Sequence, residues 1–231
     1  MTPLTPRAEA ISAARDILPL AFGVAVYGAA FGLLAAQAAM TELEVGVMGA
    51  LVFAGSSQIV AVERMIAGAG AAAAIVAGVA LNLRLLLITA SVRDIYRDRP
   101  WWQIALGAHL ATDENWALML AKRGEGAQAG YWYLVGGGLL IGVTWLVATT
   151  AGVAFARMIP EPRAIGMDFA FTAAFIAILR SLFRGRADVV PWAVAIGVVA
   201  LGQGTGLIPP AWTLIAGGLA GTVVAGLTAD D

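Results

Sequence analysis

Eight long apolar runs divide the sequence, and they constrain its fold more than any other feature does. A helix needs about 20 mostly apolar residues to cross the hydrocarbon core of a bilayer. Only short loops remain between the runs, so the chain has no room for a soluble domain. We predict an all-α polytopic membrane protein with about six to eight membrane segments, some of them broken or re-entrant. The candidate segments are residues 17–40, 45–62, 66–91, 101–121, 131–157, 167–183, 189–207 and 212–228.

The composition agrees with a chain that is solvated by lipid. Hydrophobic residues make up 60% of the sequence and charged residues 13%, against about 45–50% and about 25% in soluble domains. The chain has no cysteine, which excludes disulfides, thiolate metal sites and Cys nucleophiles. Its net charge of −1 provides no basic surface for nucleic acid. No cofactor is expected.

The domain prediction is one transmembrane transporter domain over residues 1–231, with residues 1–16 as a cytoplasmic N-terminal segment. The first apolar run is longer than the 7–15 residues of a signal-peptide core, so we expect a retained first helix. If all eight segments cross the membrane, eight Lys and Arg residues lie on the N-terminal side and five on the other. If residues 45–62 and 101–121 instead enter and return, the counts become ten and three.

The second arrangement fits the excess of positive charge in cytoplasmic loops better. Both arrangements place the N- and C-termini in the cytoplasm. Irregular backbone at membrane depth is tolerated only where protein or a water-filled cavity surrounds it. The two segments that enter and return therefore mark a candidate cavity.

A polar break interrupts the segment 45–62 at Gly55, Ser56, Ser57 and Gln58. Glycine permits local unwinding, and the two hydroxyls and the amide then offer hydrogen bonds to a substrate or a coupling ion. The alternative is a structural role, since Ser and Gln also join helices in membranes. We predict these four residues as substrate-binding.

Asn82 and Arg84 lie inside the apolar segment 66–91. Two residues on a helix are about 200° apart, so these side chains face nearly opposite directions and cannot line one narrow cavity. An arginine at bilayer depth is usually paired or lines water. We predict substrate binding for both residues; Arg84 would hold a substrate carboxylate or neutralise a coupling acid, and the alternatives are a static ion pair or snorkelling.

The segment 101–121 carries His109, Asp113 and Glu114. On a continuous helix His109 and Asp113 would share one face, and a desolvated carboxyl group can exchange protons near neutral pH. We predict a proton-coupling role for these three residues and for Asp168, whose alternative role is capping of a helix N-terminus. One histidine and two carboxylates are too few ligands to predict a metal site.

An enzymatic role is the less favoured alternative. Ser56 or Ser57 with His109 would make an intramembrane Ser–His pair, but the G-x-S-x-G turn of hydrolases is absent from the sequence. We therefore predict no catalytic residue. Small residues at Gly28–Gly32, Gly202–Gly206 and Gly217–Gly221 are interpreted as helix-packing contacts.

The ordered set of these motifs resembles the AzlC family, the large subunit of bacterial branched-chain amino acid exporters. The order and spacing agree over roughly residues 15–185, and the C-terminal part is generic. The motifs are Leu18-Pro19-Leu20-Ala21-Phe22-Gly23, Phe53-Ala54-Gly55-Ser56-Ser57-Gln58, Asn82-Leu83-Arg84, Thr112-Asp113-Glu114 and Gly166-Met167-Asp168-Phe169.

The resemblance implies an exporter driven by the proton-motive force, with an amino-acid substrate and a small AzlD-type membrane subunit as partner. Arg84 or a helix N-terminus near Gly55 would then hold the substrate carboxylate. Asp113 or Glu114 would hold the ammonium group or carry the proton. The chain departs from the family where Leu85-Leu86-Leu87-Ile88 replaces a histidine-containing stretch, so an exporter of another small solute is the alternative.

Overall fold

The computed structural model describes residues 5–68, 71–158, 185–208 and 210–228, together with the single residues 176 and 183. Within these residues the chain forms helices and no strand. Four stretches among them are long and apolar enough to cross a membrane: Pro6–Gln37, Ala74–Ser91, Tyr131–Arg157 and Arg186–Thr205. The predicted all-α polytopic membrane architecture is confirmed.

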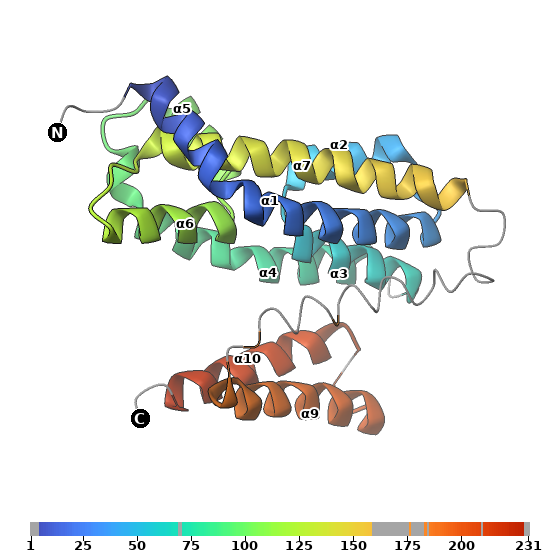
Figure 1. Ribbon diagram of the computed structural model, residues 1–231. Coiled ribbons are helices and arrows are strands. Elements are labelled where there is room, and N and C mark those ends of the chain that lie inside the picture. Colours follow the sequence, from blue (N-terminus) through green and yellow to red (C-terminus); the bar gives the residue numbers. More distant parts are fainter. Residues whose placement is uncertain are drawn as a thin grey trace.

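Two predicted segments, 45–62 and 101–121, are each split into two helices. The elements, shown in Figure 1, are α1 (Pro6–Gln37), α2 (Glu42–Val52), α3 (Gly55–Ile66), α4 (Ala71–Ser91), η1 (Arg93–Tyr96), α5 (Trp101–His109), α6 (Asp113–Gly124), α7 (Tyr131–Arg157), η3 (Arg186–Asp188), α9 (Val189–Thr205) and α10 (Pro210–Thr228).

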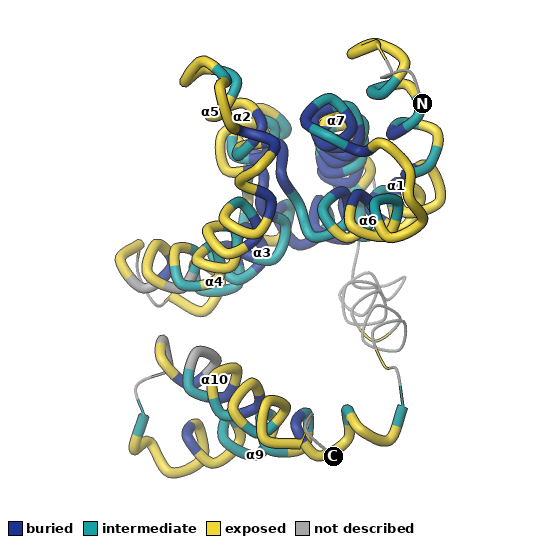
Figure 2. Tube along the Cα trace, turned by 90° about the vertical axis from the view of Figure 1, so that its left-hand side faces the viewer, coloured by how far each residue is buried: buried dark blue, intermediate teal, exposed yellow. Residues whose placement is uncertain are grey.

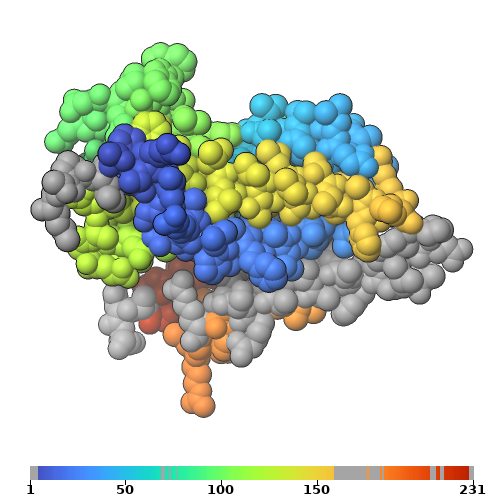
Figure 3. All heavy atoms as spheres, turned by 45° about the horizontal axis from the view of Figure 1, so that its top comes forward, coloured from blue at the N-terminus to red at the C-terminus, as the bar shows by residue number. Residues whose placement is uncertain are grey.

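The centre of the bundle is the pair α1 and α7, which lie against each other along the face seen in Figure 3. Glycines bring the two backbones together. A Cβ atom at Gly32 would overlap the carbonyl oxygen of Thr149, and one at Gly152 would overlap that of Ala29. The predicted packing role of the Gly28–Gly32 spacing is confirmed. Buried residues concentrate on these two helices (Figure 2).

The helix α1 starts earlier than the first apolar run. Thr5 caps it by accepting a hydrogen bond from the backbone N–H of Ala8, and Pro6 occupies the first helical position, where its missing N–H costs nothing. Residues 6–16, which were predicted as an N-terminal segment outside the first span, therefore continue the same helix.

The pairs α2–α3 and α5–α6 form two hairpins that enter the bundle from opposite ends (Figure 1). We call α2–α3 the first hairpin and α5–α6 the second hairpin. Each half-helix has 9–12 residues, so it rises only about 14–18 Å at 1.5 Å per residue. That is about half of the hydrocarbon core. The tips of the two hairpins meet inside the bundle, where the Phe53 and His109 rings lie 6.0 Å apart.

Contacts at the two ends of α7 fix which loops lie together. At its start the backbone N–H of Gly130 donates to Glu9 of α1. At its end Arg157 pairs with Glu42, at the start of α2, over 2.7 Å. Asp94 pairs with Arg123 at 3.0 Å, which puts the loop 92–100 at the same end as the N-terminus. This is the arrangement that the count of positive charges favoured.

The helices α9 and α10 pack together, and α10 contacts α4. Gly217 and Gly221 of α10 face Ala195 of α9 closely, as their spacing predicted. The Gly202–Gly206 spacing is different: Gly206 has φ +67 and ends α9 instead of packing against a neighbour. Much of α4 and α9 is exposed and apolar (Figure 2), which suits contact with lipid. The predicted segment 167–183 lies outside the described residues, except for 176 and 183.

Candidate functional site

The polar residues of α3 and α4 separate into two groups around the N-terminus of α3. On one side the hydroxyl of Ser57 donates to Oδ1 of Asn82 over 2.7 Å. On the other side Nη2 of Arg84 donates to Oγ of Ser56 over 2.9 Å. Asn82 and Arg84 thus face different directions, as their spacing on a helix predicted. We call the first group the cavity group and the second the junction group.

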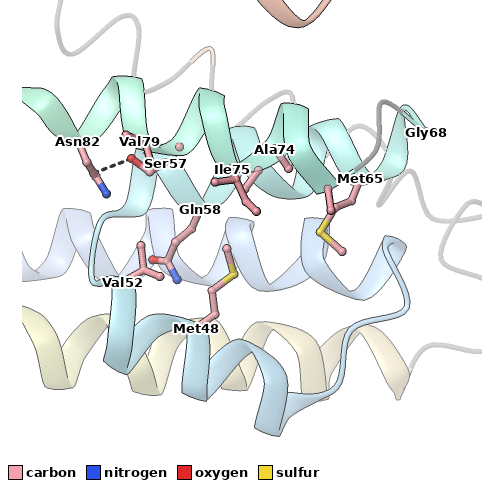
Figure 4. A pocket seen from close by; sticks show the side chains of 13 residues that line it. Met48, Val52, Ser57, Gln58, Met65, Gly68, Ala74, Ile75, Val79 and Asn82 are labelled. Carbon is pink, nitrogen blue, oxygen red and sulfur yellow. Dashed lines mark hydrogen bonds between the residues drawn. The ribbon is translucent and has the colours of Figure 1, made fainter.

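The cavity group closes one end of a cavity of about 740 Å³ between α2, α3 and α4. Figure 4 shows its side chains as sticks. Gln58 joins Ser57 and Asn82 as the third polar residue of the lining. The walls are apolar and contain methionine, valine and isoleucine. Ligand sites are usually of this kind, mostly apolar with a few placed polar groups. The lining residues are Met48, Val52, Ser57, Gln58, Ala61, Met65, Gly68, Ala71, Ala74, Ile75, Gly78, Val79 and Asn82.

The junction group connects three elements. Nη1 of Arg84 lies 2.8 Å from Oδ2 of Asp113, so α4 is tied to the second hairpin by an ion pair and to the first by Ser56. The two charged side chains are 44% and 46% exposed. His109 adds a direct link between the hairpins, because its Nε2 lies 3.0 Å from the carbonyl oxygen of Ala50. Charged and polar contacts therefore gather where the two tips meet.

The tip of the second hairpin is closed by Asn115, which the sequence analysis did not single out as a site residue. Its Oδ1 accepts from the backbone N–H of Thr112 at 2.8 Å. Its Nδ2 donates to the carbonyl oxygens of Leu110 at 2.8 Å and Leu134 at 3.0 Å. The side chain is 1% exposed. Asn115 thus satisfies the Thr112 N–H and the Leu110 carbonyl of the turn at membrane depth, and its bond to Leu134 ties the turn to α7.

Trp145 of α7 is a second residue that the sequence analysis missed. Its indole N–H donates to Oε1 of Gln58 over 2.9 Å, and its ring stacks on Phe31 with 5.6 Å between the centroids. A signal was available in the sequence. Residue 145 lies in the middle of the run 131–157, whereas tryptophans of membrane helices gather at the interfaces.

Other predicted site residues are placed differently from the expectation. His109 ends α5 and Asp113 begins α6, so the prediction that they share one helix face is wrong: the turn 110–112 interrupts the helix. Glu114 forms no ion pair among the described residues. Asp168 lies outside the described residues.

No group of three metal-ligating side chains occurs in the part of the chain that the structure describes. The partners of the serines also differ from those of a Ser–His pair. Ser56 and Ser57 bond Arg84 and Asn82, whereas the His109 ring contacts Ala50 and Phe53. The geometry gives the hydrolase alternative no support.

Comparison with known proteins gives one result. Searches of the curated proteins and of the solved structures find no match. A family model described as AzlC protein matches residues 19–159, which run from α1 to the end of α7 and include both hairpins, the cavity group and the junction group. Because this match covers more than half of the sequence, the chain belongs to the AzlC family of membrane amino-acid exporter subunits.

Proposed function

We propose that this chain is the transporting subunit of an exporter of small hydrophobic amino acids, branched-chain amino acids foremost, driven by the proton-motive force. The observation that carries the proposal is the cavity with one polar end and apolar walls. An aliphatic amino acid matches this cavity, because it has a charged head at one end and an apolar side chain at the other. Burying its side chain against such walls is worth about 0.8 kcal/mol per methylene group, and the polar end orients its charged head.

The departure from the family at residues 85–88 does not touch this cavity. None of these four residues lines it. Leu86 and Leu87 are exposed on the outside of α4, and Ile88 packs into the core. The different residues at 85–88 therefore give no reason to expect a substrate other than an aliphatic amino acid. The alternative is export of another small solute. Measuring the uptake of a panel of solutes into proteoliposomes distinguishes it from export of aliphatic amino acids.

Asp113 and Arg84 are the proton-coupling pair in this proposal, with Glu114, His109 and Asp168 as further proton carriers. Protonation of Asp113 removes its charge and breaks the ion pair that ties α4 to the second hairpin. While Asp113 is deprotonated, Arg84 neutralises this coupling acid, which is the second of the two roles expected for Arg84. Its direct binding of substrate remains a prediction.

The described positive charges support an inner-membrane orientation with cytoplasmic termini. Apart from Arg84 at the junction, nine Lys and Arg residues lie within residues 5–158: seven are toward the N-terminal end of the bundle, and Arg64 and Arg157 are toward the other end. The chain has no cysteine, so Arg97→Cys provides a single label. An impermeant maleimide is expected to react with it from the cytoplasmic side only; reaction from the outside contradicts this orientation.

A small AzlD-type membrane subunit is proposed as the partner. The half-exposed ion pair of Arg84 and Asp113 supports it, because charges at bilayer depth are covered by protein or by water. Co-expression with such a subunit is expected to yield a complex that stays together in mild detergent. Separation of the two chains under these conditions contradicts an obligatory partner.

Filling the cavity tests the transport site directly. A Cβ atom at Gly78 would meet Ser57 at 3.8–4.0 Å, which is ordinary contact, so Gly78→Leu places its bulk in the cavity without a clash at its base. We expect leucine and valine efflux to fall at least about tenfold and alanine efflux to fall less. The matched control is Gly23→Leu, since Gly23 is exposed on α1 with nothing within 4 Å. Equal efflux by both variants would contradict the role of this cavity as the transport site.

A further inference from the structure

Gln58 carries a buried hydrogen-bond donor group without a partner. The residue has 0% exposure. Trp145 donates to its Oε1 over 2.9 Å, and an indole N–H can only donate, so this contact fixes the orientation of the amide. The Nε2 group therefore points the other way, and it has no acceptor among the described residues. Buried polar groups are rarely left in this state without a functional reason.

The N-terminus of α3 is also uncapped. The side chain of Thr112 caps α6, and that of Thr41 caps α2, whereas α3 follows Ala54 and receives no side-chain cap. The first backbone N–H groups of a helix have no intrahelical acceptor, and the helix dipole makes this end positive. At membrane depth such donors need a partner.

Both donor groups belong to the start of α3. Gln58 is the fourth residue of α3, and helical side chains tilt toward the N-terminus of their helix, so the amide lies beside the first turn. Figure 4 shows it directed from α3 toward α2, which contributes Met48 and Val52 to the same cavity. Trp145 also holds this turn, because a Cβ atom at Gly55 would lie 2.9 Å from its ring.

We propose that Nε2 of Gln58 and the first turn of α3 form an anion site that binds the carboxylate of the transported amino acid. This inference rests on the proposed function. The site offers N–H donors from a positive helix end, which select a carboxylate over an ammonium group. Arg84 is not part of it, since its guanidinium is held by Ser56 and Asp113. Nε2 itself is not exposed, so a ligand reaches it by displacing a wall side chain such as the flexible Met48.

The test uses the full chain, reconstituted together with the proposed small subunit, with leucine and leucinamide as probes. Leucinamide keeps the ammonium group and the side chain but lacks the carboxylate. Wild-type protein is expected to bind leucine at least about tenfold more tightly than leucinamide. Equal binding of the two overturns the anion site without the need for any variant.

The variant Gln58→Glu keeps an acceptor for Trp145 and replaces the Nε2 donor by a carboxylate oxygen. We expect it to lose at least about tenfold in leucine affinity and to keep or gain leucinamide affinity. Gln58→Leu, which has no donor and no negative charge, should lose the preference for leucine without gaining leucinamide affinity. Gln37→Glu, the same change at the exposed end of α1, should leave both affinities unchanged.

The outcomes separate the two proposals. Failure of wild-type protein to bind or transport any amino acid contradicts the proposed function. Normal leucine transport, combined with an unchanged preference for leucine in Gln58→Glu or Gln58→Leu, overturns the anion site alone.

Discussion

The two hairpins have the same design and opposite hydrogen-bonding states. Each consists of two half-helices that meet at a short turn inside the bundle. In the second hairpin, Asn115 bonds the backbone at Thr112, Leu110 and Leu134, so the tip is closed. In the first hairpin, α3 begins without a side-chain cap, and the Nε2 group of Gln58 stays unpaired within the described part of the chain.

In the proposals made above, this difference separates a tip that holds its own backbone from a tip that binds the substrate. A hairpin in a membrane must satisfy its backbone groups, and the second hairpin does so with its own side chain. In the first hairpin, by contrast, the start of α3 has no side-chain cap and Nε2 of Gln58 has no acceptor among the residues that the structure describes. The two tips also differ in charge. His109, Asp113 and Glu114 lie at the tip of the second hairpin, whereas the tip of the first hairpin, residues 53–56, has no charged residue. We therefore assign proton coupling to the second hairpin and substrate binding to the first.

The largest expected effect comes from opening the closed tip. Asn115→Leu leaves the carbonyl oxygen of Leu110 and the N–H of Thr112, both at the turn, without the side chain that bonds them. Each unsatisfied buried group costs about 1–3 kcal/mol, so we expect the free energy of unfolding to fall by about 2–4 kcal/mol, with much less folded protein. Thermal unfolding in detergent measures this.

The control for that variant is Asn82→Leu in the cavity group, the same exchange at a residue whose side chain accepts one hydrogen bond from Ser57. It should fold nearly as well as the wild type but lose transport. A stability loss as large as that of Asn115→Leu would remove the distinction between the two tips.

The next effect concerns the ion pair between α4 and the second hairpin. Arg84→Ala is expected to abolish leucine efflux while the protein still inserts, because Asp113 then lies at the junction without a counter-charge. The control is Arg157→Ala. It removes the 2.7 Å pair with Glu42, which is similarly exposed but lies at the far end of α7. Normal efflux by Arg84→Ala, measured in proteoliposomes, would refute its role.

Proton coupling predicts a change in pH dependence and a smaller change in maximal rate. Asp113→Asn keeps the shape of the side chain but cannot release a proton, so efflux should lose its dependence on the pH gradient. Glu114→Gln should shift the pH profile less, since Glu114 forms no ion pair among the described residues. Unchanged pH profiles in both variants would leave the coupling mechanism without a carrier in this hairpin.

The sequence predicted the fold because the apolar runs report directly on the membrane solvent, and the polar breaks at residues 55–58 and 109–115 report on interrupted helices. The opposite facing of Asn82 and Arg84 also follows from helix geometry alone. The roles of Asn115 and Trp145 did not follow, since both depend on which turn or helix lies against them. The spacing of His109 and Asp113 predicted one shared helix face, and this was wrong. The turn 110–112 between them depends on hydrogen bonds from side chains, and such a turn has no reliable sequence pattern.

The smallest expected effect sharpens the comparison at its most specific contact. Trp145→Phe keeps an aromatic ring for stacking on Phe31 and removes only the N–H that holds Oε1 of Gln58. A single hydrogen bond contributes about 0.5–1.5 kcal/mol, so we expect a loss of leucine affinity of about two- to tenfold with folding retained. Because the freed amide can rotate and present its oxygen to the ligand, the preference for leucine over leucinamide should shrink as well. Equal losses for both probes would mean that Trp145 shapes the cavity without orienting the amide, and the open tip would then depend on the α3 backbone alone.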